Sequence, residues 1–503
     1  MKNIREKTAR FMVLMMMVFT TTSCEDYFDI NEDPDNPTNA NSFQLLPGTQ
    51  AWIGFSTMDA LNRITETWTQ RITNSRYEFY APNGGEINND WDRAYRTLLN
   101  LEDIIELSAT REAWHYTGVA KLQKAYLFSI LVDLFDDIPF SEASKGAENF
   151  AAEFDDSEQI YDQLIALIDE GIADLNETST TILGGNDDDL VYGGDVENWI
   201  KMGNTLKLKL YNQIRLVEPQ VAAQGIDALL NNPDKLIQSN AENFNIPFYP
   251  NASPNNLNPY YQTFYVTKGE NHISTFLDSV LNANEDPRYP YLIYNQSGNF
   301  AGRKPGDGIT IRGNDANTKS IYAVYPTGGL YDDGGSVNVD AQSGDGDAPA
   351  RLITYYMRKF IEAEAKLTLE GVDGNAAEAL EEAIRASFDD ILSFSRAKGA
   401  PNLTDDEIDL YVDARMAAFE AAATEEEKLE IIMLEKYVAL TGNGIETYND
   451  YRRTGYPVLA NPITPEGPFP LRFPYATSEI ESNPNAPEEQ PADTAPVFWD
   501  ING

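Results

Sequence analysis

The chain contains little cysteine, little histidine and no apolar run long enough to span a membrane. Cys24 is the only cysteine among 503 residues, which excludes a disulfide framework and a cysteine-ligated metal site within the chain. The two histidines, His115 and His272, do not form an HExxH pattern, and GxSxG, phosphate-loop and dinucleotide-binding patterns are also missing. We therefore expect no catalytic residues, no resident cofactor and a protein that is not an enzyme.

Basic residues are also scarce. The chain has 37 Lys and Arg against 80 Asp and Glu, a formal net charge of −43. Such a surface repels nucleic acid and anionic lipid headgroups, so we expect no nucleic-acid partner. Because carboxylates are so frequent, pairs of acids arise by chance, and a glycosidase pair cannot be identified from sequence. Aromatic residues are plentiful, with 27 Tyr, 23 Phe and 6 Trp, which predicts a globular protein.

Residues 1–23 have the composition of a secretory signal peptide. Four basic residues precede an apolar run of nine, Phe11 to Phe19, and small polar residues then lead to Cys24. Nine residues are too few to cross a bilayer, which takes about 20. A cysteine at the cleavage position is typical of bacterial lipoproteins, so we predict lipidation of Cys24, with palmitate an expected acyl group. The alternative is an ordinary secreted protein with one stray cysteine.

The remaining residues divide by composition. Residues 24–47 are rich in Asn, Asp and Pro, which predicts an extended, lipidated tether. Residues 48–230 and 351–455 carry apolar residues at three- and four-residue spacing, typical of amphipathic helices. Between them, residues 231–350 are rich in Gly, Asn, Pro, Asp and Tyr and predict a loop-rich lobe. Residues 456–503 predict an irregular tail that wraps over the helical body.

The helical segments follow one another through short connections, so we expect antiparallel pairs. This favours a mainly α fold, an α-solenoid of TPR-like helix pairs with an irregular lobe, in a single domain over residues 48–503. A 34-residue repeat signature is absent, so the repeat character is inferred from helix length and pairing alone. Three helix starts have capping-box spacing: Asp155 with Glu158, Thr404 with Glu407, and Thr424 with Glu427. A further helix is expected from Arg351 to a stop at Gly371.

A series of short motifs runs through the chain in order. They are Asp29 to Pro34 with Asn36-Pro37-Thr38; Asp133 to Ala143; Asp189 to Lys209; Glu362 and Glu364; Glu446 with Tyr451 to Pro457; and Arg472 to Tyr475. In this order they resemble the SusD/RagB family of nutrient-binding outer-membrane lipoproteins of Bacteroidetes, and most closely its second, SusD-like branch. Asp136, Gly203 and Lys209 depart from the family pattern, in which Gly, Ala and Arg are usual.

The resemblance implies a helical body of TPR-like pairs and a non-enzymatic role. Members of this family lie as a lid on a SusC-like TonB-dependent transporter, capture an oligosaccharide or oligopeptide outside the cell, and deliver it. Glu25-Asp26, directly after the anchor, resembles surface-export signals of this bacterial group, so we expect the cell outer membrane and its exterior face. Family resemblance does not fix the ligand. The alternative functions are a surface glycan-active hydrolase and a structural or adhesive lipoprotein.

Sugar binding needs flat apolar ring faces beside polar groups, which Tyr and Trp supply. Aromatic residues in loops are the better candidates, because those on helical stripes are usually core. The candidates are Tyr77, Phe79, Tyr80, Tyr294, Tyr322, Tyr325 and Tyr331. The alternative for each ring is burial under the lobe. Trp91, Trp114 and Trp199 lie on apolar stripes and are predicted to be core residues.

Two charged groups have alternative interpretations. Arg452 and Arg453 could grip an anionic ligand, but bonds to helix-terminal carbonyls or internal carboxylates are the favoured role in so acidic a protein. Asp187-Asp188-Asp189 and Asp332-Asp333 offer oxygen ligands for calcium, yet neither has the DxDxDG spacing of a dedicated site. We favour solvated acidic turns and expect no metal site.

Overall fold

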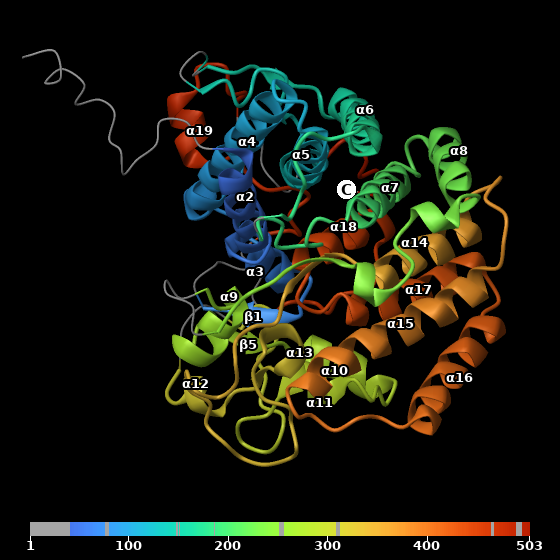
Figure 1. Cartoon of the computed structure of the whole chain (residues 1–503). Coiled ribbons are helices and arrows are strands. Elements are labelled where there is room, and N and C mark those ends of the chain that lie inside the picture. The colour runs from blue at the N-terminus through green and yellow to red at the C-terminus, as the bar shows by residue number, and fades with distance from the viewer. Residues whose placement is uncertain are drawn as a thin grey trace, which may run out of the picture.

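Helices make up most of the described chain, which confirms the predicted mainly α class (Figure 1). The computed structural model describes residues 41–75, 80–146, 149, 151–185, 187–250, 256–307, 312–463, 467–488 and 495–502. Within these residues the strands are two to four residues long and form separate two-stranded antiparallel ladders. No helix of the described part of the chain is both long and apolar enough to cross a bilayer.

The first part of the helical body is a row of neighbouring helices. Its members are α2 (Ser42–Ser56), α4 (Asn88–Ala109), α5 (Trp114–Phe135), α6 (Ser157–Asn176), α7 (Val196–Gln213) and α8 (Pro219–Leu230), and each packs on the next. Helices α5 and α6 approach closely because Gly118 faces Gly171. A Cβ on Gly118 would lie only 2.6 Å from the Gly171 carbonyl oxygen.

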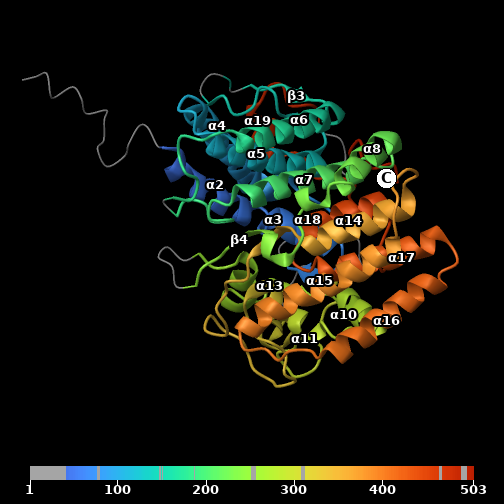
Figure 2. The same ribbon diagram turned by 45° about the vertical axis from the view of Figure 1, so that its right-hand side comes forward.

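The second part continues the row after the lobe (Figure 2). It consists of α14 (Tyr355–Thr368), α15 (Ala376–Ala397), α16 (Asp405–Ala421) and α17 (Glu425–Ala439), with α14 packed on α7, α15 and α17. The side chains of Thr404 and Thr424 accept from the backbone N–H groups of Glu407 and Glu427, which confirms two of the three capping boxes. Two more helices, α3 (Ala60–Trp68) and α18 (Gly444–Thr454), pack on each other beside the row.

The lobe between these parts contains only short elements and occupies the lower part of Figure 1. Its helices are α9 (Pro259–Tyr261), α10 (Thr275–Ala283), α11 (Tyr289–Leu292), α12 (Asp315–Thr318) and α13 (Val324–Thr327). Its strand β5 (Asn271–Ile273) pairs with β1 (Ile72–Asn74) of the N-terminal part, and β6 (Ile293–Tyr294) pairs with β7 (Ile321–Tyr322). At its two ends, β4 (Phe244–Ile246) pairs with β8 (Ala350–Ile353). The β1–β5 and β4–β8 ladders fasten the lobe to the body, whereas the β6–β7 ladder lies within the lobe.

The C-terminal tail lies against the end of α5. The Phe473 backbone N–H donates to the Leu134 carbonyl at 2.8 Å, and the Trp499 indole Nε1–H donates to the buried Asp133 carboxylate at 3.0 Å. The tail also contains α19 (Thr477–Ser482), which packs on α4. Near it, the strands β2 (Ile138–Pro139) and β3 (Phe154–Asp155) form the remaining ladder.

Four local predictions differ from the structure. Residues 42–47 were expected in the tether but belong to α2, because the Asn41–Gln44 capping box starts the helix and burial of Leu46 outweighs the cost of Pro47. Helix α14 begins at Tyr355 and not at Arg351, because Arg351 lies in β8 and pairs with Asn245 of β4. Helix α6 is capped by Asp156, because Asp155 lies in β3.

Trp114 is half-buried, at the first turn of α5, whereas Trp91 and Trp199 are core residues as predicted. Residues 1–40, including Cys24, lie outside the described residues.

Candidate functional site

Most of the aromatic residues predicted to contact ligand lie in the core. Tyr294, Tyr322 and Tyr325 are at most 2% exposed. The Tyr322 hydroxyl donates to the buried Glu66 carboxylate, and the Tyr325 hydroxyl donates to Asp390 at 2.5 Å. A buried tyrosine whose hydroxyl is satisfied in this way offers no ring face to a ligand. These three rings are therefore buried in this structure, which is the alternative given for each candidate ring.

The other candidates differ in exposure. Tyr331 is half-buried, with its ring packed edge-on against Tyr291 at a centroid distance of 4.9 Å, and its contact with ligand stays a prediction. Tyr80 is 8% exposed, and its hydroxyl accepts from Gln70 Nε2 at 3.3 Å. Tyr77 and Phe79 lie outside the described residues, so their assignment also stays a prediction.

One large exposed ring that sequence reasoning missed is Trp52 on α2. It is 44% exposed, and its neighbour one turn on, Phe55, lies 6.3 Å away between ring centroids. Phe55 in turn contacts Phe248 edge-on at 5.4 Å. We call Trp52, Phe55 and Phe248 the aromatic ridge. A sequence signal existed, because Leu46 and Ile53 mark the buried stripe of α2 and Trp52 falls beside it.

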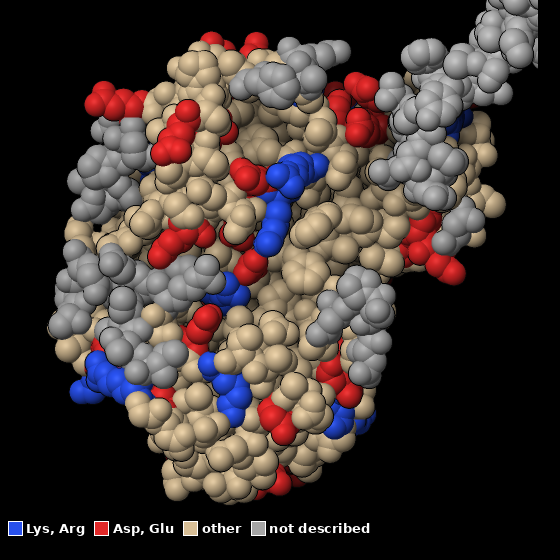
Figure 3. Space-filling model, turned by 90° about the vertical axis from the view of Figure 1, so that its left-hand side faces the viewer, with Lys and Arg blue, Asp and Glu red and all other residues tan. Residues whose placement is uncertain are grey.

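A cavity of about 230 Å³ adjoins the aromatic ridge, and we call it the α2–α3 pocket. It is lined by Phe55, Asp59, Arg63, Leu257, Pro259, Gln262 and Thr263. The first three come from α2 and α3, and the others come from the beginning of the lobe. Figure 3 shows this side of the molecule, which is the left-hand side of Figure 1: its surface is hollowed, and Lys or Arg side chains lie beside Asp or Glu in the hollow.

Charged groups of both signs are fixed around Asp59, the N-cap residue of α3. Arg63 contacts one oxygen of its carboxylate at 3.0 Å, and Arg93 of α4 donates to the other at 2.7 Å. The Arg93 guanidinium also lies over the Trp52 ring, 5.8 Å from its centroid. Behind them, burial raises the pKa of Asp90 to about 7, with the negative charge of Asp59 as the second cause.

This arrangement suits an uncharged polyol. Trp52 and Phe55 present apolar ring surface to C–H groups, the Asp59 carboxylate accepts from hydroxyls, and guanidinium N–H groups donate to them. The Gln262 side-chain amide forms no hydrogen bond with any residue that the structure describes, so both its donors and its acceptor are available to a ligand. Asp59 pairs with both Arg63 and Arg93, which leaves these three groups with one positive charge in excess.

The remaining charged candidates have internal partners. Arg453 is buried and pairs with Glu364 and Asp450, while Arg452 donates to the Asp133 and Leu471 carbonyls. The predicted internal role of both arginines is therefore confirmed. Asp189 accepts from Gln50 and from the Trp199 indole, both at 2.8 Å.

Aspartates of the two acidic turns also accept hydrogen bonds from side chains within the protein. Asp188 accepts from Tyr116, and Asp332 accepts from Asn295 at 2.7 Å. In the part of the chain that the structure describes, no three His, Cys, Asp or Glu residues are grouped to hold a metal ion.

Comparisons with known proteins agree on one fold. The family model described as "Starch-binding associating with outer membrane" matches residues 38–476. A solved chitin-binding protein superposes with a TM-score of 0.73 at 23% identity, covering 92% of this chain and 100% of its own. A SusD homologue from Bacteroides fragilis NCTC 9343 gives 0.71 at 21% identity, covering 88% and 94%.

A further solved structure extends this picture. A chitin-binding SusD homologue from Flavobacterium johnsoniae gives a TM-score of 0.70 at 21% identity, covering 92% of this chain and 98% of its own. At these identities the solved structures establish the fold alone. Among the curated proteins, none matches the chain.

Proposed function

The chain belongs to the SusD/RagB family, in its SusD-like branch, and from this premise we propose that it captures glycans outside the cell and delivers them to a transporter. The observation that carries the proposal is Trp52, a large ring exposed beside the α2–α3 pocket with its fixed carboxylate and guanidinium groups. A sugar ring has apolar C–H faces and polar hydroxyl groups at its edge. The exposed indole can contact a C–H face, and the carboxylate and guanidinium groups can form hydrogen bonds with the hydroxyls.

The proposed ligand is an oligosaccharide without charge. The family model is described as starch-binding, and two solved structures of this fold are chitin-binding proteins. Starch and chitin fragments are therefore the first ligands to test. An oligopeptide is the other ligand class compatible with the family, and the pocket's amide and carboxylate groups would also bind a peptide backbone.

The proposed location is the exterior face of the outer membrane, reached through a lipid anchor on Cys24. The signal-like residues 1–23 and the cysteine at the predicted cleavage position support this location. A SusC-like TonB-dependent transporter is the proposed partner, with this protein as its lid. A binding role without catalysis is in keeping with the fold and with the absence of recognisable catalytic motifs in the sequence.

Calorimetric titration of the purified protein with starch and chitin oligosaccharides tests the binding role. We expect one of these series to bind and Trp52→Ala to weaken it about tenfold, which corresponds to about 1.4 kcal/mol. Leu410→Ala is the matched control, because Leu410 is 75% exposed on α16, away from the pocket, and should leave affinity unchanged. If Trp52→Ala binds the sugar with wild-type affinity, the α2–α3 pocket is not the binding site. If shortened sugars are released during the titration, the protein is a hydrolase and not only a binding protein.

A further inference from the structure

A second cavity lies on the opposite side of α4 from the aromatic ridge. Its volume is about 390 Å³, and it is lined by residues of α4, by described residues between Pro139 and Ala152, and by Glu479 and Asn483 at α19. Its size is within the range of small-ligand sites, and it shares no lining residue with the α2–α3 pocket. Arg93 donates to Asp59 of the first pocket and Trp91 lines the second, since residues two apart on a helix point to nearly opposite sides.

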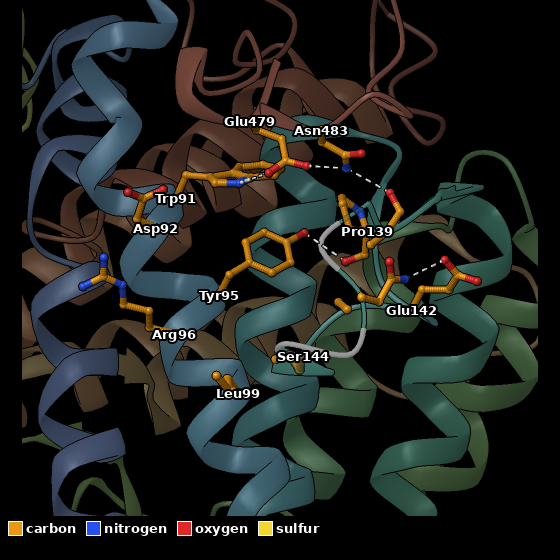
Figure 4. A pocket seen from close by; sticks show the side chains of 14 residues that line it. Trp91, Asp92, Tyr95, Arg96, Leu99, Pro139, Glu142, Ser144, Glu479 and Asn483 are labelled. Carbon is orange, nitrogen blue, oxygen red and sulfur yellow. Dashed lines mark hydrogen bonds between the residues drawn. The ribbon is translucent and has the colours of Figure 1, made fainter. Parts of the chain in front are cut away.

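The floor of this cavity is apolar and aromatic. Trp91, Tyr95 and Leu99 follow one another at four-residue spacing along α4, and the first two rings lie 4.9 Å apart with their planes tilted by 41°. Figure 4 shows these rings on one side of the cavity and Pro139 and Glu142 across from them. Trp91 is only 2% exposed and lies beneath the surface, so the floor offers the partly exposed Tyr95 ring and Leu99 to the apolar side of a ligand.

Several neutral donors around the cavity are already used within the protein, whereas the Ser144 hydroxyl has no hydrogen-bond partner among the described residues. The Trp91 indole Nε1–H donates to Glu479 at 3.3 Å, and the Tyr95 hydroxyl donates to the Pro139 carbonyl at 2.9 Å. The Asn483 amide donates to Glu479 at 2.7 Å and to the Ala152 carbonyl at 2.9 Å. Most of the hydrogen-bonding positions that remain at the cavity are carboxylate oxygens. Because these oxygens accept hydrogen bonds, a ligand must supply the donors.

The charge of the lining is negative. Asp92, Glu142 and Glu479 line the cavity together with a single basic residue, Arg96. Neither Glu142 nor Glu479 forms an ion pair with a Lys or Arg of the described residues. Carboxylates that have only neutral partners at the wall of a cavity favour a cationic ligand over a neutral one and disfavour an anionic one.

The negative surface continues along α4. An adjoining cavity of about 460 Å³ shares Leu99, Ala143, Ser144 and Gly146 with the first and adds three acidic residues, Glu102, Asp103 and Glu106, and two basic ones, Lys124 and Lys145. Lys124 is paired with Glu102 at this site. Burial raises the pKa of Asp103, and the charge of Glu102 raises it further. The two cavities form one groove, and an extended ligand can lie along it.

We propose that this groove is a second binding site, for an oligosaccharide that carries protonated amines, such as one built of 2-amino-2-deoxyhexose units. Each ammonium group supplies three donors to the carboxylates, and the sugar ring packs against Tyr95 and Leu99. The choice of a sugar over another cation rests on the proposed glycan-binding function. The site itself rests on the cavity, on the Tyr95 ring in its floor, and on the carboxylates of Glu142 and Glu479, which have no Lys or Arg partner among the described residues.

Calorimetric titration of the detergent-extracted protein with a glucosamine tetramer, and with its fully N-acetylated form, tests the proposal. Acetylation removes the charge and keeps the sugar ring. We expect the amine form to bind through this groove and the double variant Glu142→Gln, Glu479→Gln to weaken it at least tenfold. Raised salt should weaken it as well, because the attraction is between charges. Glu420→Gln on α16 is the matched control, since it removes an exposed carboxylate far from the groove.

Other outcomes separate this proposal from the first. If the double variant binds the amine tetramer as wild type does, the groove is not its site. If a tetralysine peptide binds at the groove and displaces the amine tetramer at equal concentration, the assignment to a sugar is wrong. Trp52→Ala should leave binding of the amine tetramer intact, so failure of the α2–α3 pocket as a glycan site and failure of the groove are seen in different variants.

Discussion

At the scale of single residues, Asp90 couples the environment of the α2–α3 pocket to pH. It is 2% exposed, and burial raises its pKa to about 7. In the unfolded chain an aspartate titrates near pH 4. Between about pH 4 and about pH 7 the folded protein therefore holds a proton that the unfolded chain has lost. The contribution of Asp90 to stability falls as pH rises through that window.

Asp90→Asn should remove this dependence, because an amide keeps the shape of the neutral carboxyl and does not ionise. We expect the free energy of unfolding of the variant to equal that of the wild type near about pH 4 and to exceed it by roughly 1–3 kcal/mol near about pH 8. Urea unfolding across this range measures the difference between the two proteins. A difference that does not change with pH would show that Asp90 is ionised in the folded state.

Single residues also show where sequence reasoning failed. Tyr322 and Trp52 are both aromatic, and the sequence placed the first in a loop-rich lobe and the second near a helix start. The lobe is fastened to the body by short ladders, and Glu66 of α3 lies where it can accept the Tyr322 hydroxyl. That contact joins residues far apart in sequence, so no local pattern could reveal it.

At the scale of elements, buried ion pairs join helices of the two parts of the body. Glu364 of α14 is fully buried and accepts from Arg215 Nε at 2.8 Å, from Asn212 Nδ2 at 3.0 Å and from Arg453 of α18. One carboxylate is thus shared by two buried guanidinium groups, and Arg453 also pairs with Asp450. Removing the charge of Glu364 takes away the ion-pair partner of Arg215 and leaves Arg453 with Asp450.

Glu364→Gln should lower the free energy of unfolding by about 3–5 kcal/mol. Glu381→Gln provides the comparison, since Glu381 pairs with Arg385 at 2.9 Å on the exposed face of α15 and should contribute less than about 1 kcal/mol. Chemical denaturation of both variants at one pH measures the contrast. Equal losses would mean that the Glu364 cluster is no stronger than a surface pair.

Elements were predictable where local sequence determines them. The stripes and the Thr404 and Thr424 capping boxes located long helices, because both signals act within a few residues. The ladders were not predictable, because β1 and β5 are three residues each and pair across the lobe boundary. The start of α6 was misplaced by one residue for the same reason: Asp155 is held by β2 and by the backbone N–H groups of Phe140 and Ser141.

At the scale of the whole molecule, the body and lobe could be outlined from composition, but the candidate site could not. The α2–α3 pocket forms where α2, α3 and the segment from Leu257 to Thr263 meet, and Arg93 reaches it from α4. Sequence identifies each of these segments separately. Their meeting depends on how the lobe docks on the body, which is set by tertiary contacts rather than by any motif.

The proposed membrane anchor can be tested separately from the fold. A single acyl chain binds a membrane only marginally, whereas several chains, at about 0.8 kcal/mol per buried CH₂, hold a protein firmly. Cys24→Ala removes the sulfur that would carry the diacylglyceryl group. We expect wild-type protein in the outer-membrane fraction and the variant outside it, with the same thermal unfolding midpoint, because residue 24 precedes the first described helix at Ser42. Mass spectrometry of the wild type should show the added lipid mass on the peptide beginning at Cys24. An unmodified sulfur, or a variant that stays with the membrane, would show that another part of the chain provides the attachment.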